Sequence, residues 1–310
     1  GRASRLTRQT WTAAGCARLF VAWAAGIARV PGDYVIYSPG ASYDLLGREG
    51  DVDTVTVTGV DTFETEGQIH MTTVAVTRAD ARVGLPEVLF AHWAPDRSVF
   101  PRDAVYPAGA SATEVRARDV QLMTSAQSDA AAAALREAGV PVRPLPMISS
   151  VASAGPSVDL LFAGDFVLEV DGDPTATVEE VRAGIASHSI GETVTFTVLR
   201  DRQELEIGIE TEASRTDPGT PVAGLNLIMG ISYDPRVTFA LEQGVGGSSA
   251  GLMMALAVYD RVTPESLTRG MIVAGTGAVD GAGDVAPVGG IDEKVAAARR
   301  VGAKLVMLPR

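Results

Sequence analysis

A serine flanked by small residues lies in the last third of the chain. Residues 247–251 read Gly-Ser-Ser-Ala-Gly, and an apolar stretch follows from 252 to 259. The small neighbours would let a substrate carbonyl approach the hydroxyl of Ser249. Free backbone N–H groups at the start of a helix could stabilise the oxyanion that forms there. Alone this pattern is weak, because small residues occupy any tight turn before a packed helix.

Few residue types in this chain could act as the general base for such a serine. The same pentapeptide fits a histidine-dependent hydrolase, in which an acid and then a histidine follow the nucleophile in the chain. The three histidines are His70, His92 and His188, so none follows Ser249. A lysine with a depressed pKa can deprotonate a serine, whereas an arginine cannot.

Only two of the 26 basic residues are lysines, Lys294 and Lys304. Asp292 is expected to cap a helix that runs to Gly302, which puts the Lys294 amine in the first helical turn. The positive end of the helix dipole disfavours an ammonium ion there, and burial against residues 296–298 acts in the same direction. Lys304 begins a predicted strand and is expected at a solvated edge. The sequence therefore favours Lys294 as the partner of Ser249.

Composition indicates globular domains and excludes several kinds of partner. The chain has 310 residues, of which 46% are apolar and 21% charged, enough for roughly two domains. Residues 1–30 hold five arginines and no acid, so the remaining 280 residues carry 21 basic against 38 acidic side chains. Such an acidic body would repel nucleic acid. The single Cys16 and the scattered histidines fit no metal motif, so we expect no metal and no cofactor.

The basic N-terminal segment precedes a short apolar run at residues 19–28. This run is short for a bilayer span, and a basic region followed by an apolar core also describes an export signal. We expect residues 1–31 to be a membrane anchor or signal segment, and the alternative is a buried amphipathic helix. The arginines would keep its N-terminal side cytoplasmic. The predicted location is the cell membrane, with a single pass and the catalytic part outside the cytoplasm.

Residues 140–211 have a pattern of short strands around one helix. A strand is predicted at 166–170, a capping box at 177–180 opens a helix to about 187, and 193–199 pairs with 205–209 in a hairpin. The order of these elements, and the stretch 161–172, resemble a PDZ domain of bacterial envelope proteases. Such a domain binds an extended peptide end as an added strand. The carboxylate-binding loop, expected within 144–149, lacks a clear Gly-Φ-Gly-Φ pattern, so peptide specificity stays open.

Four motifs in the last third resemble, in order and spacing, the proteolytic domain of Lon proteases. They are residues 247–251, 274–277 (Ala-Gly-Thr-Gly), 288–298 (Val-Gly-Gly-Ile-Asp-Glu-Lys-Val-Ala-Ala-Ala) and 302–309 (Gly-Ala-Lys-Leu-Val-Met-Leu-Pro). The resemblance implies that Ser249 is the nucleophile and Lys294 its partner. It also implies that Thr276 hydrogen-bonds near this dyad. Backbone N–H groups near Ser248 and Ala250 would hold the oxyanion.

The implied fold class is α+β, a Lon-type proteolytic domain with an inserted PDZ-like β-rich domain. Residues 68–76 are similar to the first long strand of the Lon domain and 122–127 to its first helix. The expected limits are 1–31 for the anchor or signal, 32–139 for the first part of the protease domain, 140–212 for the PDZ-like domain and 213–310 for the second part. This arrangement resembles the membrane-bound, PDZ-containing Lon-like proteases of Gram-positive bacteria.

Two departures from Lon affect the expected chemistry. No Gly-x-x-x-x-Gly-Lys-Ser/Thr loop is present, so no ATP-driven unfoldase is expected. Ser248 stands where a proline is common, which adds a second hydroxyl beside the nucleophile. Lon-type domains often form rings, so the resemblance also implies a homo-oligomer.

The sequence therefore predicts an ATP-independent serine endopeptidase with a Ser249–Lys294 dyad, acting on envelope or membrane-associated proteins. Protein or peptide substrates are the expected partners, with the PDZ-like domain recognising them. One alternative is an inactive peptide-binding scaffold at the cell envelope. Another is an esterase that pairs Ser249 with the upstream His188.

Overall fold

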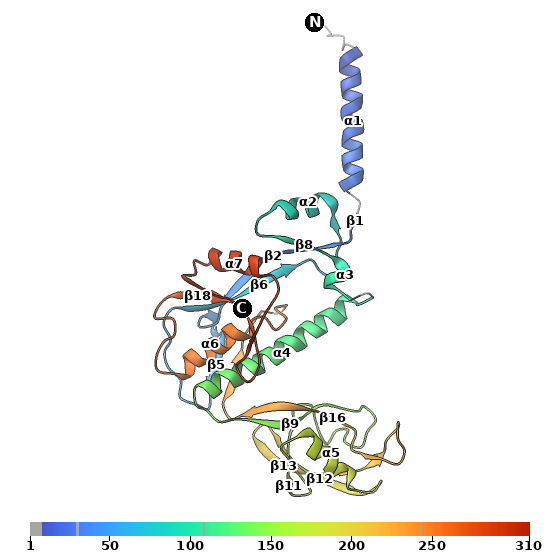
Figure 1. Ribbon diagram of the computed structural model, residues 1–310, viewed down its shortest axis with the longest axis vertical. Coiled ribbons are helices and arrows are strands. Elements are labelled where there is room, and N and C mark those ends of the chain that lie inside the picture. Colours follow the sequence, from blue (N-terminus) through green and yellow to red (C-terminus); the bar gives the residue numbers. More distant parts are fainter. Residues whose placement is uncertain (1–7, 29–30, 108, 243) are drawn as a thin grey trace.

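The computed structural model describes residues 8–28, 31–107, 109–242 and 244–310. Figure 1 shows a long helix standing apart at one end, a central body of sheet and helices, and a second sheet at the other end. Helices and strands both contribute substantially, so the predicted α+β class is confirmed.

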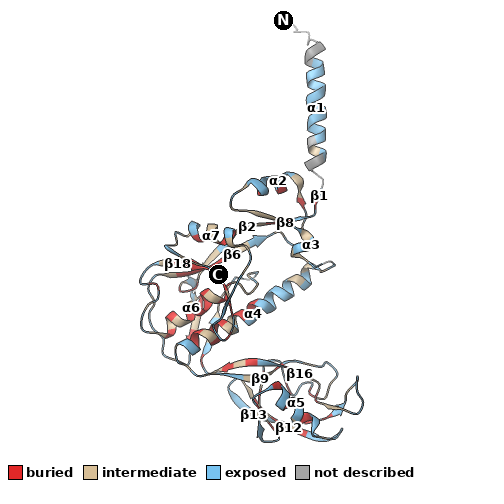
Figure 2. Cartoon of the chain, in the orientation of Figure 1, coloured by how far each residue is buried: buried red, intermediate tan, exposed pale blue. Residues whose placement is uncertain are grey.

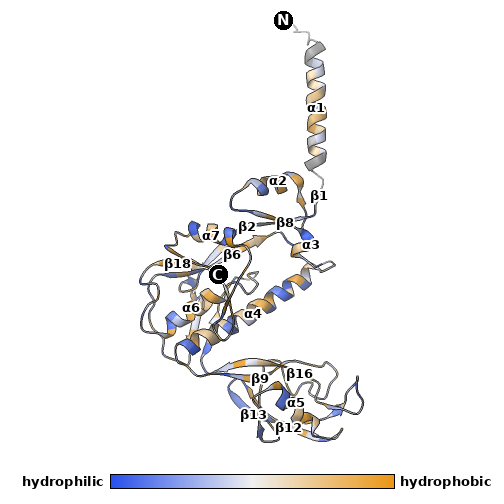
Figure 3. Ribbon diagram, viewed as in Figure 1, coloured by the Kyte–Doolittle hydropathy of each residue, from blue (hydrophilic) through white to orange (hydrophobic). Residues whose placement is uncertain are grey.

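Helix α1, Arg8–Ala28, is the separate helix. Its large apolar side chains, among them Trp11, Leu19 and Phe20, are exposed. Figure 3 shows hydrophobic colour along part of this helix. Within the described ranges, no helix is both long enough and apolar enough to cross a membrane. The anchor or signal at 1–31 stays a prediction, and Arg2, Arg5 and Arg29 of that segment lie outside the described residues.

The body is built on a five-stranded sheet in the order β21-β18-β6-β2-β8. These strands are β2 Tyr34–Asp44, β6 Gln68–Val76, β8 Ser98–Pro101, β18 Ile272–Gly275 and β21 Leu305–Met307. Strand β18 runs parallel to both β6 and β21, whereas β2 is antiparallel to β6 and β8. The sheet therefore joins strands from before and after the β-rich segment, as an insertion requires.

Helices cover this sheet on both faces (Figure 1). On β6, Ile69 and Met71 pack with Met253 in the main core, which holds side chains of α4 (Ala112–Glu137) and α6 (Gly251–Val262). Helix α7, Ile291–Arg300, contacts β2 and β6 but contributes nothing to that core, so it lies on the opposite face. The N-terminal half of α4 projects beyond the core and is mostly exposed (Figure 2).

Shorter elements complete the body. They are β1 Pro31–Gly32 with β7 Val83–Gly84, β3 Arg48–Glu49 with β4 Val52–Asp53, β5 Val55–Thr58 with β17 Arg236–Phe239, β19 Ala278–Val279 with β20 Val285–Ala286, and the helices α2 Leu85–Trp93 and α3 Arg102–Val105.

The second sheet has the order β13-β12-β10-β9-β16. Its elements are β9 Val142–Val151, β10 Phe166–Val170, β12 Thr193–Arg200, β13 Gln203–Glu210 and β16 Leu225–Tyr233, with α5 Val178–Ala186, β11 Asp173–Pro174, β14 Glu212–Ala213 and β15 Pro221–Val222 nearby. The predicted strand at 166–170 and the hairpin are present. Thr177 and Glu180 form the predicted capping box, because each side chain accepts from the other's backbone N–H.

Strand β16 follows residue 212, where the sequence places the end of the β-rich domain, yet it pairs with β9 along its whole length. It is also the edge strand of this sheet. Residues 144–149, where a carboxylate-binding loop was expected, lie inside β9 between β10 and β16. That expectation was wrong, because these residues form a sheet ladder. The limits 32–139, 140–212 and 213–310 stay predictions.

Candidate active site

Ser249 lies in the turn that leads into α6. Gly247 has φ of 87°, a left-handed conformation that glycine adopts without strain. A Cβ on Gly251 would lie 3.0 Å from the backbone nitrogen of Val279, so a larger residue would push the helix start and that strand apart by a few tenths of an ångström. The two glycines of the pentapeptide are therefore explained by backbone geometry. The helix that contains the apolar stretch begins at Gly251.

The carbonyl oxygen of Ser249 is held by residues that follow β18. It accepts a hydrogen bond from the backbone N–H of Gly277 at 2.9 Å and another from the Thr276 hydroxyl at 2.8 Å. The backbone N–H of Leu252 returns a bond to the Gly277 carbonyl at 2.9 Å. The serine turn is therefore fixed to the end of strand β18.

Three backbone N–H groups at this turn have no acceptor among the described residues. They belong to Ser248, Ser249 and Ala250. Ala250 is the N-cap of α6, and no side chain caps the helix there. Unpaired N–H groups at a helix start carry partial positive charge. They can therefore donate hydrogen bonds to an oxyanion, which is the role that the sequence predicts for them.

Lys294 lies in the first turn of α7. The N-cap of this helix is Gly290, in the left-handed conformation with φ of 71°, and its carbonyl accepts from the Lys294 backbone N–H at 3.0 Å. The prediction that Asp292 caps the helix was wrong, because the helix begins at Ile291 and Asp292 is its second residue. The amine nevertheless starts from the predicted first turn.

The Lys294 amine is buried and donates a hydrogen bond of 3.1 Å to the Thr276 hydroxyl. Burial lowers the pKa of this lysine to about 8, and the neighbouring Glu293 carboxylate opposes the shift. A substantial fraction of the amine is then neutral near pH 8, which a general base requires. Lys304, the other lysine, is exposed beside the edge strand β21.

Thr276 joins the two halves of the site. It is fully buried at the end of β18, between α7 on one face of the sheet and the Ser249 turn associated with the other. Its hydroxyl accepts a hydrogen bond from the Lys294 amine and donates one to the Ser249 carbonyl. In the part of the chain that the structure describes, the Ser249 hydroxyl and the Lys294 amine share no direct hydrogen bond. Ser248 and Ser249 are both partly exposed, so burial does not distinguish them.

Glu293 is a residue of this site that the sequence reasoning passed over. Its side chain is 1% exposed, and one carboxylate oxygen, Oε1, is buried with no hydrogen-bond partner among the described residues. Its charge acts on both Lys294 and Tyr37 of β2. The available signal was its position next to the predicted base on a short amphipathic helix.

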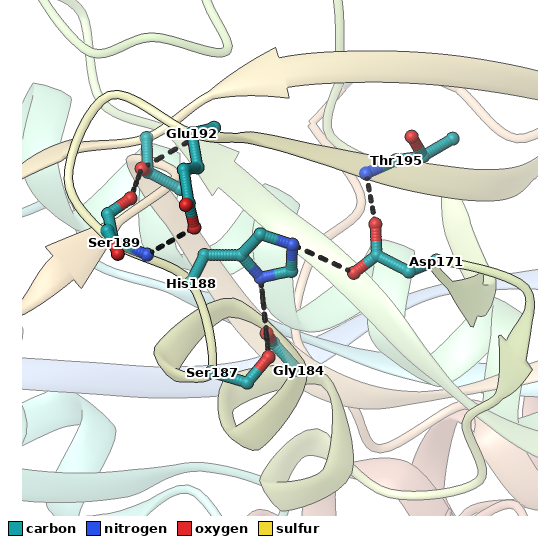
Figure 4. Close-up of polar contacts among 8 residues, drawn as sticks. Asp171, Gly184, Ser187, His188, Ser189, Glu192 and Thr195 are labelled. Carbon is teal, nitrogen blue, oxygen red and sulfur yellow. Dashed lines mark hydrogen bonds and ion pairs between the residues drawn. The ribbon is translucent and has the colours of Figure 1, made fainter.

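His188 belongs to the second sheet's domain. Its Nε2 lies 3.4 Å from an Asp171 carboxylate oxygen, and its Nδ1 lies 3.1 Å from the Gly184 carbonyl oxygen (Figure 4). Its Nδ1 also lies 3.3 Å from the Ser187 hydroxyl oxygen. These partners all come from α5 and the β10–β11 turn, so the structure offers no support for the esterase alternative. No cluster of side chains suited to a metal ion occurs in the described ranges.

Family comparisons match two separate parts of the chain. Residues 244–310, which contain Ser249, Thr276 and Lys294, match the Lon protease (S16) C-terminal proteolytic domain. Residues 126–211 match the PDZ domain. The chain combines a Lon-type proteolytic domain with a PDZ domain. The predicted resemblance to PDZ-containing Lon-like proteases is thereby confirmed.

Curated Lon proteases match short stretches of this chain. Lon protease 2 of Syntrophobacter fumaroxidans is 46% identical over 63 residues, which are 20% of this chain and 8% of that protein. The archaeal Lon protease of Halobacterium salinarum is 38% identical over 79 residues, 25% of this chain and 11% of that protein. The chain thus aligns with about a tenth of the length of these relatives.

Among solved structures, the PDZ domain of the SdrC-like protein from Listeria monocytogenes is 27% identical to this chain. The match covers 27% of this chain and 86% of that domain, with a TM-score of 0.25.

Proposed function

We propose that this chain is an ATP-independent serine endopeptidase in which Ser249 is the nucleophile and Lys294 the general base. The observation that carries the proposal is the buried Lys294 amine, with a pKa of about 8, hydrogen-bonded to the hydroxyl that also holds the Ser249 carbonyl. The match to the Lon proteolytic domain over residues 244–310 supports the same assignment.

The reaction proceeds through an acyl-enzyme. The neutral Lys294 amine takes the proton of the Ser249 hydroxyl as the oxygen attacks the peptide carbonyl, and the oxyanion accepts hydrogen bonds from the N–H groups of the turn. Lys294 then gives the proton to the departing amine as the peptide C–N bond breaks. A water molecule, deprotonated by Lys294, hydrolyses the ester and restores the serine. The serine–lysine hydrogen bond forms when substrate is bound, since such bonds are often long in free enzymes.

The substrates that we propose are unfolded segments of envelope or membrane-associated proteins. The PDZ domain supports this class, because PDZ domains bind extended peptides. We also propose a membrane location with the catalytic part outside the cytoplasm, and assembly into a homo-oligomer. ATP independence is proposed because the sequence contains no phosphate-binding Gly-x-x-x-x-Gly-Lys-Ser/Thr loop.

The test is cleavage of an unfolded protein, such as reduced and alkylated casein, without nucleotide. We expect cleavage by the wild type and its loss in Ser249→Ala and in Lys294→Arg, which keeps the charge but cannot be deprotonated. Ser248→Ala is the matched control, since it removes the adjacent hydroxyl. Thermal unfolding of each variant shows whether lost activity is accompanied by lost structure.

The possible results distinguish the Ser249–Lys294 dyad from a Ser248 nucleophile and from an inactive scaffold. Full activity of Lys294→Arg would refute the lysine base, and loss of activity in Ser248→Ala alone would transfer the nucleophile to that residue. A wild-type protein that binds peptides but forms no acyl-enzyme by mass spectrometry would favour the inactive scaffold.

A further inference from the structure

Helix α2, Leu85–Trp93, has apolar residues on two opposite faces. Its buried residues, Val88 and Ala91, pack in a small core with side chains of β2, β7 and β8. A helix that covers a core with one face normally turns polar residues toward water with the other. Helix α2 departs from this rule, because its outward face is apolar as well.

The outward face consists of four exposed residues at the spacing i, i+3, i+4 and i+7. They are Pro86, Leu89, Phe90 and Trp93, which together form the exposed α2 face. The spacing places them on one side of the helix. Leu89, Phe90 and Trp93 are 53%, 63% and 79% exposed. Apolar surface gathered in this way marks contact with another protein or with a membrane.

The exposed α2 face is too small to hold a protein partner by itself. The helix has nine residues, so the face is about 14 Å long and about 10 Å wide. A stable protein interface buries roughly 800 Å² on each partner. A lipid surface requires no matching shape, and it binds a short apolar helix face in proportion to the area inserted. Size therefore favours lipid over a second copy of the chain.

The exposed α2 face lies close to α1. Strand β1, Pro31–Gly32, begins three residues after the end of α1 and pairs with β7, Val83–Gly84, which directly precedes α2. Helices α1 and α2 are in contact, and Figure 1 shows both at the same end of the body. Helix α1 also exposes large apolar side chains. A bilayer that holds α1 therefore comes near α2.

The residue types of the face suit the headgroup region of a bilayer. Tryptophan is enriched at membrane–water interfaces, and helices that lie in this region carry Trp, Phe and Leu on their inserted face. The Arg97 guanidinium lies 5.5 Å from the centroid of the Phe90 ring, so a cation accompanies the face to the level of lipid phosphates. The polar residues Glu87 and His92 fall on the flanks of the helix, between its two apolar faces.

We propose that the exposed α2 face inserts into the headgroup region of a lipid bilayer and holds the body against it beside α1. The inference rests on the membrane location proposed above. It adds a contact made by the body itself, whether α1 spans the bilayer or lies on it. Two points of contact fix the orientation of the body relative to the membrane.

The experiment uses the tryptophans of the chain, which are Trp11, Trp23 and Trp93. The whole chain with Trp11→Phe and Trp23→Phe keeps Trp93 as its single tryptophan. It is reconstituted into vesicles of phosphatidylcholine and phosphatidylglycerol in which one lipid carries bromine on its acyl chain. We expect the Trp93 emission to shift to shorter wavelength. Bromine near the headgroup end of the chain should quench it more strongly than bromine near the chain end.

Two substitutions in this single-tryptophan protein show whether the α2 face is responsible. Leu89→Asp puts a charge on the face and should abolish both the shift and the quenching. Leu160→Asp is the matched control, because Leu160 is 45% exposed in the PDZ domain, and it should change neither. Equal effects of the two substitutions contradict the proposal.

Other results also decide against it. Trp93 emission that stays unquenched while the protein floats with the vesicles overturns the α2 contact. A shift that depends on protein concentration in the absence of vesicles assigns the face to a second copy. The variant with Trp11→Phe and Trp93→Phe reports on α1 through Trp23. Quenching of Trp23 alone refutes only the α2 contact, whereas no quenching at either position and no flotation refute the membrane location as well. Casein cleavage tests the protease proposal separately.

Discussion

The Lys294 amine donates to the Thr276 hydroxyl across 3.1 Å, and the same hydroxyl donates to the Ser249 carbonyl across 2.8 Å. One buried side chain thus fixes the proposed base and the turn that carries the proposed nucleophile. Lys294 and Ser249 are 45 residues apart; the lysine lies in α7, and the serine lies in the turn before α6, a helix on the other face of the sheet. Their relative position depends on this hydroxyl and on the end of β18.

Thr276→Val should lower kcat by about tenfold to a hundredfold with little change in KM. Valine keeps the shape of threonine but removes the acceptor of the amine and the donor to the carbonyl, each hydrogen bond contributing about 1 kcal/mol. Thr276→Ser keeps the hydroxyl and is expected to retain most of the activity. Equal losses in both variants would indicate a packing role for the methyl group instead.

The pH profile of kcat/KM should rise with pH and reach half its maximum near pH 8, because Lys294 acts only when neutral and burial lowers its pKa to about 8. The Glu293 carboxylate favours the ammonium form and therefore raises that pKa. Glu293→Gln should consequently move the rising limb to lower pH. Profiles from pH 6 to pH 10 on one peptide measure both values, and a limb that stays in place or moves to higher pH contradicts this coupling.

Asp165→Asn should destabilise the PDZ domain by about 3 kcal/mol. The Asp165 side chain is 2% exposed and binds Arg200 through two hydrogen bonds of 2.7 and 2.6 Å, while also accepting the Phe162 backbone N–H. The amide removes the charge that compensates Arg200. Urea unfolding followed by far-ultraviolet circular dichroism measures the change.

Asp80→Asn is the control for that measurement. The side chains of the Arg78–Asp80 pair are 78% and 52% exposed. Exposed ion pairs contribute at most about 1 kcal/mol to the free energy of unfolding. An equal effect of the two substitutions would show that burial of the Asp165 pair is unimportant.

Local elements were the most predictable part of the fold. The strand at 166–170, the hairpin after it and the Thr177–Glu180 capping box all depend on alternation, turn residues or a four-residue contact. Long-range pairing was not predictable in this way. Strand β16 pairs with β9, although the paired residues are more than 70 positions apart in the sequence. The alternation of residues within β16 does not indicate which strand it pairs with.

The cap of α7 shows a local limit. Asp292 is a favourable N-cap type, but Gly290 can take the left-handed conformation that the chain needs as it turns past Val74, and the helix begins there. The tertiary contact with β6 decided between two plausible N-cap positions that are two residues apart.

The sequence by itself determined which side chains could do the chemistry: a serine between small residues, a threonine in a Thr-Gly step and one of two lysines in an arginine-rich chain. Only the tertiary structure decided how deeply Lys294 is buried, that the Thr276 hydroxyl bonds both its amine and the Ser249 carbonyl, and that the buried Glu293 carboxylate lies beside it. The reason is physical. Residue type sets what a group can donate or accept, whereas its pKa and its partners depend on the water that the packing of distant strands and helices removes.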